Sequence, residues 1–336
     1  MTIVGLGPHG ERASPPERVT LLPQDKTAAR AKKLRVAIVM HTLESDWAKH
    51  VVQGIIGTLG ECGAIVIDVV DCNFSSEAQI DALGRLQGEN PDAIISLPVN
   101  NTTVTKAHLA ISGAGIKLVL IDNVPTGMLP GKDYVSLVSA DNFGLGKIAA
   151  ELLSARLPLG ASAGMLAYDA DFFATNEREI AFSRWMEVNR PDVAVKTARF
   201  STIDGAGHEA VQLINDHSEI AGLFVVWDSP CIDVVRAVSK RNPDMPITTV
   251  DLGQEVTESL AKGGPVIGIA GQRPFQQGEA VARTTITTLL DRPCPDWVAL
   301  PGLIVSRSNV IESYQAIWRK PAPRDILIRL DLLQSK

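Results

Sequence analysis

Short runs of Val, Ile and Leu alternate with longer segments of helical periodicity along most of this chain. The first run covers residues 35–41 and a helix is predicted over 46–61; the alternation continues to a strand at 266–271 and a helix over 275–290. Uninterrupted apolar runs are typical of strands that are buried on both faces. The pattern therefore predicts an α/β fold in which helices cover both faces of parallel sheets.

Residues 134–150 mark the point where one series of strand–helix units ends and another begins. They contain an apolar strand, a polar corner and a helix that Ser139 or Asp141 can cap. Gly144 and Gly146 lower the helix propensity of its first turns, and close packing is a physical reason for glycine there. Since 336 residues exceed the usual size of one core, we predict two α/β lobes.

Composition excludes several classes of partner. Hydrophobic residues make up 45% of the chain and charged residues 21%, which is typical of a globular protein. The net charge is −6 and no basic stripe is visible, so we expect no nucleic acid partner. No apolar run reaches the roughly 18 residues of a membrane-spanning helix. The cysteines form no CxxC pair and are interpreted as core residues rather than a zinc or redox site: Cys62, Cys72, Cys231 and Cys294.

Motifs of catalysis are missing or out of context. Residues 5–10 match GxGxxG, but residues 11–19 cannot begin a helix. The strand–turn–helix unit of a dinucleotide-binding site is therefore not predicted here. We find no Ser–His–Asp arrangement, HExxH motif or phosphate loop. His41 and His50 stand alone and are interpreted as satisfied core or surface residues. We therefore predict no catalytic residue, no metal site, no cofactor and no enzymatic activity.

The residues at the predicted carboxyl ends of the strands are rich in Asp, Asn, Gln and aromatic types. Ligands of open α/β sheets bind beyond these ends. Carboxylates accept hydrogen bonds from hydroxyl groups, amides donate and accept, and flat rings cover the C–H faces of a sugar. The set therefore favours a neutral, polyhydroxylated ligand, and it comprises residues 42–47, 71–72, 98–101, 122–123, 168–176, 200, 227–228, 251 and 272–273.

The order and spacing of five segments resemble the ribose-type periplasmic sugar-binding proteins, which share the fold of LacI-type repressor cores. These segments are SADNFGLGKIAAELL at 139–153, LVLIDN at 118–123, NEREIAF at 176–182, TTVDLG at 248–253 and GIAGQRPFQQG at 268–278. The resemblance covers residues 35–318. It implies an α/β fold of two doubly wound parallel-sheet lobes, joined by three crossovers, with a ligand cleft between them.

The resemblance also implies where the lobes begin and end. The expected parts are a flexible leader at 1–33, an N-terminal lobe at 34–140 plus 273–303, a C-terminal lobe at 141–272 plus 304–320, and a C-terminal extension at 321–336. The leader has prolines at positions 8, 15, 16 and 23 and reads as disordered or loosely attached. The extension is apolar enough to pack on a lobe surface.

The family's ligand residues carry over to this sequence with departures. An aromatic that stacks on the sugar corresponds to Trp47, although the second aromatic of the family is Ala48 here. Two frequent arginines are replaced by Asn123 and Asn176, and an asparagine is replaced by Trp227. The implied ligand-binding set is Trp47, Asp122, Asn123, Asn176, Arg178, Phe200, Trp227, Asp228, Asp251 and Gln272. The departures predict a flatter, more aromatic and less cationic cleft, suited to a neutral sugar or polyol rather than an acidic sugar.

Several of these residues have structural alternatives. Trp47 and Trp227 could belong to the core, and Asp122 and Asp251 could cap helices. Arg178 could pair with Glu179 or Glu187 instead of a ligand. Phe172 and Phe173 follow a strand end, and a lid or packing role is as well supported for them as ligand contact. Asp141 is expected to cap and shape the hinge rather than to bind ligand.

The leading function implied is a solute-binding protein that delivers a small carbohydrate to the membrane subunits of an ABC-type importer by hinge closure, as a monomer. Its expected location is the periplasm. The first 33 residues contain no apolar segment of a secretory signal, so a cytoplasmic location is the alternative. The alternative is a sugar-sensing regulatory protein that acts through a protein partner. DNA binding is not expected, because only 34 residues precede the first strand and they do not resemble a helix-turn-helix.

Overall fold

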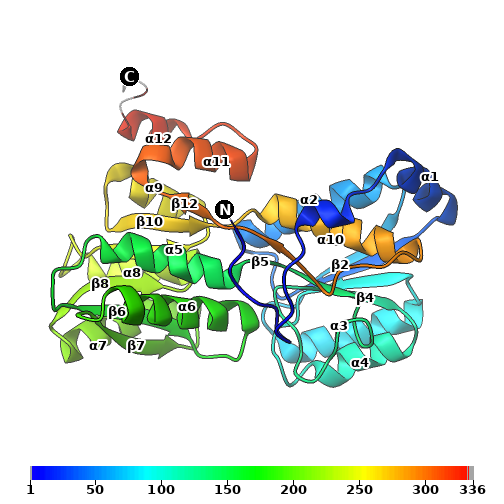
Figure 1. Cartoon of the computed structure of the whole chain (residues 1–336), viewed down its shortest axis with the longest axis horizontal. Coiled ribbons are helices and arrows are strands. Elements are labelled where there is room, and N and C mark those ends of the chain that lie inside the picture. The colour runs from blue at the N-terminus through cyan, green and yellow to red at the C-terminus, as the bar shows by residue number, and fades with distance from the viewer. Residues whose placement is uncertain (1, 331, 333–336) are drawn as a thin grey trace.

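The computed structural model describes residues 2–330 and 332 of the chain, and it consists of two α/β lobes side by side (Figure 1). The first lobe is formed by α1 (Pro23–Lys32), β1 (Arg35–Met40), α2 (Asp46–Glu61), β2 (Ile65–Asp71), α3 (Ser76–Glu89), β3 (Ala93–Ser96), α4 (Thr105–Gly113), β4 (Lys117–Ile121), β5 (Ser136–Ala140), α10 (Pro274–Leu289) and β11 (Trp297–Leu300). Its six strands lie in the order β11-β5-β4-β3-β1-β2, and all neighbours are parallel.

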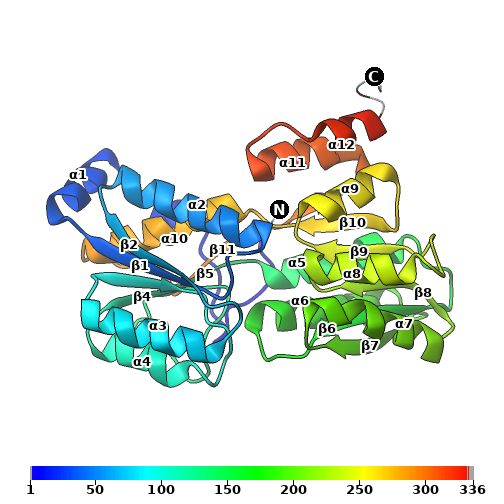
Figure 2. The same ribbon diagram turned by 180° about the vertical axis from the view of Figure 1, so that it is seen from behind.

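Both faces of this sheet are buried, as its apolar strands predict. Along β1, Ile38 and Met40 face a core shared with α2 and α10, while Ala37 and Val39 face a core shared with α3 and α4. Figure 2 shows α2 and α10 above the sheet and α3 and α4 below it. Alternate residues of one strand thus serve two cores, which is why the strand is apolar from Val36 to Met40.

The second lobe repeats this plan. It is formed by α5 (Asn142–Ser154), β6 (Ser162–Tyr168), α6 (Phe173–Asn189), β7 (Ala194–Phe200), α7 (Ala206–Asp216), β8 (Ile220–Val225), α8 (Asp228–Val238), β9 (Ile247–Val250), α9 (Gln254–Lys262), β10 (Val266–Gly271), β12 (Leu303–Val305), α11 (Val310–Trp318) and α12 (Arg324–Arg329). Its six strands lie in the order β12-β10-β9-β8-β6-β7. The predicted fold class is confirmed by this pair of sheets.

The chain passes between the lobes three times: from β5 to α5, from β10 to α10, and from β11 to β12. The last passage makes β12 antiparallel to β10, a departure from an all-parallel sheet. Apart from β12, the strands of both sheets point toward the junction of the lobes. A chain that leaves β11 and continues straight into the second lobe therefore runs against the direction of its strands.

The corner between β5 and α5 confirms the expected role of Asp141. Its carboxylate caps α5 by accepting from the backbone N–H of Gly144 at 3.0 Å. Gly146 explains the close approach of the next helix, because a Cβ at this position would overlap the carbonyl oxygen of Arg178 on α6. Gly278 allows the same approach in the first lobe, where α10 meets the carbonyl of Val51 on α2.

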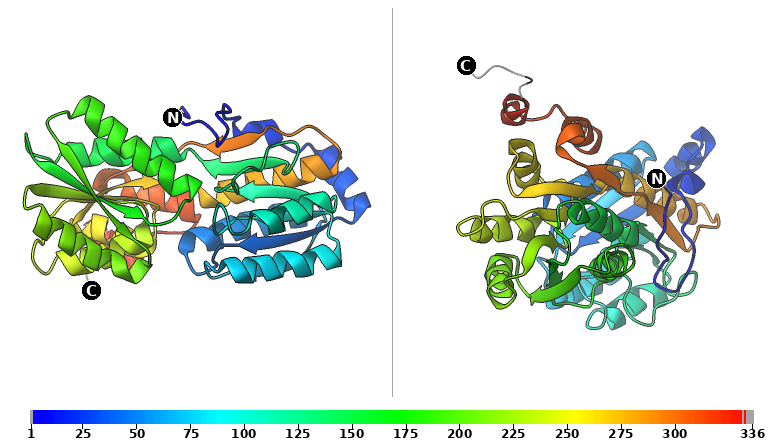
Figure 3. Two further views of the ribbon diagram at one scale, coloured as in Figure 1. Left: turned by 90° about the horizontal axis from the view of Figure 1, so that it is seen from below. Right: turned by 60° about the vertical axis from the view of Figure 1, so that its left-hand side comes forward.

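The segment before β1 differs from the loosely attached leader that was expected. The N–H groups of Val4 and Gly5 donate to the Asp141 carboxylate, so the segment is tied to the first crossover (Figure 3). Ser14 pairs with β11 at Val298, and Val19 is buried against the first lobe. The physical reason is that β11 is an edge strand, whose free backbone groups the segment covers despite its prolines.

The other end of the chain packs on the second lobe as far as it is described. Ile326 on α12 is buried, and Leu327 and Leu330 lie against the same core. Residue 331 and residues 333–336 of the expected extension lie outside the described residues. Cys62, Cys72 and Cys231 are buried thiols, as predicted, whereas Cys294 is half-buried. Within the described ranges, no helix has both the length and the apolar character to cross a membrane.

Candidate functional site

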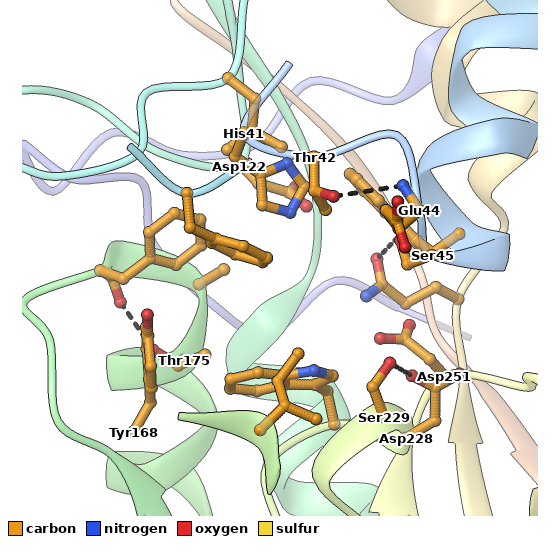
Figure 4. A pocket seen from close by; sticks show the side chains of 18 of the residues that line it. His41, Thr42, Glu44, Ser45, Asp122, Tyr168, Thr175, Asp228, Ser229 and Asp251 are labelled. Atoms are coloured by element: carbon orange, nitrogen blue, oxygen red, sulfur yellow. Dashed lines mark hydrogen bonds between the residues drawn. The ribbon is translucent and has the colours of Figure 1, made fainter. Parts of the chain in front are cut away.

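A cavity of about 220 Å³ lies between the lobes, where the carboxyl ends of both sheets meet (Figure 4). The first lobe contributes His41, Thr42, Glu44, Ser45, Trp47, Phe74, Leu97, Val99 and Asp122. The second lobe contributes Tyr168, Phe172, Ala174, Thr175, Arg178, Ile203, Trp227, Asp228, Ser229 and Asp251. Gln272, in the second crossover, completes the lining. Strand topology thus brings together residues that are far apart in the sequence.

Two aspartates occupy equivalent positions in the two lobes. Asp122 follows β4 and Asp251 follows β9, the third strand in the order of each sheet. Both have left-handed backbones, with φ of 51° and 72°, and both are nearly inaccessible to solvent. Non-glycine residues seldom adopt this conformation, and such strain is typical of functional sites. The turn after each strand therefore aims a carboxyl group into the space between the lobes.

Arg178 is held rigidly beside the second of these carboxyls. Its Nε donates to Asn142 Oδ1 at 2.9 Å, and its Nη1 donates to the carbonyl of Val226 at 3.1 Å. The same Nη1 lies 4.0 Å from Asp251 Oδ2. Glu179, one of the alternative partners considered above, instead bonds Arg199 at 3.0 Å. The guanidinium is thus a fixed cationic group in the wall of the cavity.

Burial dominates the protonation of the carboxyl groups. It raises the pKa of Asp122 to about 6, although Arg178 and a hydrogen bond from Gln277 oppose the rise. Burial also raises the pKa of Asp228 and of Asp251. The charge of Asp251 adds to the rise at Asp228, whereas Arg178 opposes it at Asp251. Arg178 therefore favours the ionised form of Asp251, whereas the charge of Asp251 favours the neutral form of Asp228.

Aromatic rings form the walls between these polar groups. The indole N–H of Trp47 donates to Gln272 Oε1 at 3.1 Å, which fixes the ring against the second crossover. Across the cavity, Trp227 packs edge-on against Tyr168, with ring centroids 5.1 Å apart. Fixed rings of this kind supply apolar contact area at little entropic cost to the bound state.

Seven of the ten predicted site residues line the cavity: Trp47, Asp122, Arg178, Trp227, Asp228, Asp251 and Gln272. Three do not. Asn123 is fully buried, where it donates to the Pro98 carbonyl and accepts from the N–H of Phe173 in the other lobe. Asn176 donates to Asp171, and Phe200 is buried behind Tyr168 and Trp227. Asn123 and Phe200 stand one layer behind the lining, whereas Asn176 is half-buried outside it, and strand-end position does not reveal these distinctions.

The interpretation of His41 as a satisfied residue is wrong. Its ring lines the cavity, and its buried Nδ1 has no hydrogen-bond partner among the described residues. Burial lowers its pKa to about 4, so the imidazole is neutral at pH 7. Phe74 was also missed, because it lies three residues beyond β2. The signal for His41 was its place directly after β1, which the sequence does show.

Residues 36–291 match the family model of the periplasmic binding protein domain, which spans most of the chain. This protein belongs to the periplasmic binding protein family. It is 23% identical to the ribose import binding protein of Bacillus subtilis over 229 residues, or 68% of this chain and 73% of that protein. The resemblance seen in the sequence is thereby confirmed.

Solved structures of the family share this fold. One is a solute-binding protein of an ABC transporter from Agrobacterium vitis with bound α-D-tagatopyranose; it is 19% identical, with a TM-score of 0.78 over 87% of this chain and 100% of that chain. Another is a carbohydrate transporter solute-binding protein from Agrobacterium radiobacter in complex with D-arabinose, 17% identical, with a TM-score of 0.75 over 85% of this chain and 99% of that one.

The side chains that line the cavity combine hydrogen-bonding groups with apolar surface. Among residues 2–330 and 332, no group of three or more His, Cys, Asp or Glu side chains is arranged to hold a metal ion. The cavity offers carboxylate acceptors, one fixed guanidinium, an amide and several rings. These groups can surround a small hydroxylated molecule with hydrogen bonds at its edge and apolar contacts on its faces.

Proposed function

We propose that this protein binds a neutral sugar or polyol between its lobes and delivers it to the membrane subunits of an ABC-type importer. The observation that carries the proposal is the pairing of Asp122 and Asp251 across the cavity, with Trp47 and Trp227 as walls. Ionised carboxylates accept strong hydrogen bonds from hydroxyls, and they disfavour acidic ligands. The solved relatives that contain a tagatose and an arabinose support this ligand class.

The proposed mechanism is closure of the lobes about the three crossovers, without covalent chemistry. A ligand that contacts both lobes binds the closed state better and so shifts the equilibrium toward it. We propose residues 34–140 plus 273–303 and residues 141–272 plus 304–320 as the moving units. Family membership supports a periplasmic location and an action as a monomer; cell fractionation and light scattering of the purified protein test these two points.

The alternative of a sugar sensor that acts through a protein partner receives no support from the relatives described above. The ribose import protein and the two solved structures belong to transport systems.

A thermal-shift screen tests the proposed ligand class. Neutral sugars and polyols should raise the melting temperature, whereas acidic sugars and amino acids should not. At a hundredfold excess of ligand over Kd, the expected gain in the free energy of unfolding is about 2.7 kcal/mol. Asp122→Asn and Asp251→Asn should weaken the response, and Asp81→Asn on the exposed side of α3 is the matched control. Stabilisation by acidic or amino ligands alone would refute the proposal.

A further inference from the structure

The cavity has two chemically different ends. Figure 4 shows the polar end, where Asp228, Ser229 and Asp251 gather, on the side away from Thr175. Thr175 donates to the carbonyl of Phe172 at 3.1 Å, so Phe172 marks the opposite end. We call this the aromatic end, and define it by His41, Phe74 and Phe172. The ring centroid of His41 lies 5.0 Å from that of Phe74 and 6.5 Å from that of Phe172.

Phe74 reaches this position through a strained backbone. Asn73 and Phe74 have φ of 44° and 57°, and a bulky residue rarely adopts the left-handed region. Hydrogen bonds hold the turn in place: the N–H of Asn73 donates to Asp71 at 2.8 Å, and that of Phe74 donates to the carbonyl of His41 at 2.7 Å. The ring is still 41% exposed. Packing of the core does not account for a strained, exposed ring, whereas contact with a ligand does.

Much of the remaining surface at the aromatic end is apolar. Leu97 and Val99 line the cavity from the neighbouring strand end, and both present apolar side chains. His41 is neutral at pH 7, because burial lowers its pKa to about 4, and its Nδ1 is buried. A hydroxyl group placed here can pair with the ring of His41, but not with the phenyl rings and aliphatic side chains that make up most of this end, whereas a methyl group gains apolar contact with them.

From this arrangement we infer that the ligand is a monosaccharide or polyol with an apolar substituent, such as the methyl group of a deoxy sugar, seated against His41, Phe74 and Phe172. The inference rests on the proposed function, and it adds that one end of the ligand carries no hydroxyl. The hydroxylated part then meets Asp122, Asp251 and Gln272, while the apolar substituent fills the aromatic end.

Isothermal titration calorimetry with matched pairs of compounds tests this inference. Each pair contains a sugar or polyol and its analogue with methyl in place of hydroxymethyl, for example D-galactose with D-fucose and L-mannose with L-rhamnose. The tightest ligand should be a deoxy member, bound about ten- to a hundredfold tighter than its hydroxylated partner, the range that apolar pockets reach against an added hydroxyl. A fully hydroxylated tightest ligand overturns the inference but leaves the proposed function standing. Binding of acidic or amino compounds alone overturns the proposed function instead.

A substitution at Phe74 tests whether the aromatic end causes the preference for the deoxy member of each pair. Asparagine tolerates the left-handed backbone and provides hydrogen-bonding groups, so Phe74→Asn should fold normally and reduce the preference for the deoxy member to less than about threefold. Leu159→Asn, at an exposed position of the other lobe, is the control that should keep the preference. Thermal unfolding of both variants checks that they are folded. An unchanged preference in Phe74→Asn contradicts the assignment.

Discussion

The two lobes share one topology but differ in the chemistry they bring to the cavity. Each has six strands, and each places an aspartate with a left-handed backbone after the third strand of its order. In the first lobe, Asp122 accepts from the neutral amide of Gln277 at 2.8 Å. In the second lobe, Asp251 lies beside the Arg178 guanidinium and a second carboxyl, Asp228. Both walls of the cavity carry aromatic rings, but the wall of the second lobe adds a cation and a second aspartate, and we call it the charged wall.

This difference shows how a repeated fold can divide the recognition of one ligand. The rings that both lobes contribute are suited to the C–H faces of a sugar, because aromatic contact area tolerates small changes in pose. The charged wall of the second lobe is suited to hydroxyl groups, because charge-assisted hydrogen bonds are strong and directional. We therefore expect substitutions in the second lobe to have the larger effects on stability and affinity.

The largest effect is expected from Arg178→Met. This substitution removes the cation beside Asp251 and leaves Asn142 and the Val226 carbonyl without their donor. Breaking a buried pair costs about 3–5 kcal/mol when one charge is left uncompensated. Urea denaturation should show a loss of unfolding free energy in this range, and ligand binding should fall below detection at millimolar concentrations.

The control for this experiment is Arg184→Met on the same helix, where the side chain is exposed. Surface arginines contribute less than about 1 kcal/mol, so this variant should resemble the parent. If Arg178→Met were also as stable as the parent, Asp251 would have to be protonated in the folded protein, and the assignment of the charged wall would be wrong.

A smaller effect than that of Arg178→Met is expected from pH, which changes the free energy of unfolding through the buried carboxyl groups of the two lobes. The pKa of Asp122 rises from 3.8 to about 6 on folding, so the folded state binds its proton more tightly than the unfolded state. The resulting stabilisation is complete below pH 4 and is lost as the pH rises through 6, a change of about 3 kcal/mol. The raised pKa values of Asp228 and Asp251 act in the same direction.

Thermal unfolding of the ligand-free protein between pH 4.5 and pH 8 measures this effect. Asp122→Asn and Asp228→Asn should each flatten the decline of the melting temperature with rising pH. Asp228→Asn should flatten it more, because Arg178 opposes the rise of the pKa at Asp122 but not at Asp228. The lowered pKa of His41 acts in the opposite direction, but it cancels when variants are compared with the parent. Equal slopes in all three proteins would contradict the buried, proton-binding carboxyls.

Much of this arrangement could be predicted from the sequence, because apolar strands and strand ends are local signals. The helix predicted over 46–61 has these bounds in the structure, and the aspartates after β4 and β9 do line the cavity. The layer to which a side chain belongs is not a local signal. Asn123 and Phe200 follow strands as Asp122 does, yet they lie behind the lining.

Contacts between segments that are distant in the sequence explain the remaining differences between the prediction and the structure. The prolines of the N-terminal segment are typical of disorder, but the free edge of β11 gives its backbone a partner at Ser14. The direction of Phe74 depends on a left-handed backbone that hydrogen bonds from other segments stabilise. A sequence pattern that lacks glycine at such a position predicts the common conformation rather than the strained one.

A smaller effect is expected from a comparison of the two carboxyls within the charged wall. Asp251→Asn removes an ionised acceptor whose Oδ1 is buried without a partner among the described residues. Loss of a charge-assisted hydrogen bond costs about 1.5–3 kcal/mol, so affinity at pH 7 should fall about ten- to a hundredfold. Asp228→Asn replaces a carboxyl whose neutral form is favoured by burial and by the charge of Asp251, and we expect a change of less than about threefold. Calorimetry with the best neutral ligand measures both; equal losses would mean that both carboxyls are ionised.

The smallest effect is expected where the lobes touch away from the ligand. Trp318, at the end of α11 in the second lobe, packs edge-on against His50 of α2 in the first lobe, with ring centroids 4.3 Å apart. Aromatic pairs contribute about 0.5–1.5 kcal/mol, and this pair spans the junction next to the crossovers. If it stabilises the closed arrangement, Trp318→Leu should lower affinity by about two- to tenfold and increase the radius of gyration of the ligand-free protein in solution scattering. Trp185→Leu, which removes a ring that packs within the second lobe, should lower stability but leave affinity unchanged. If Trp318→Leu and the parent bound the ligand equally well, the contact would be present in both the open and the closed arrangement. Closure would then depend on the ligand and the cavity walls alone.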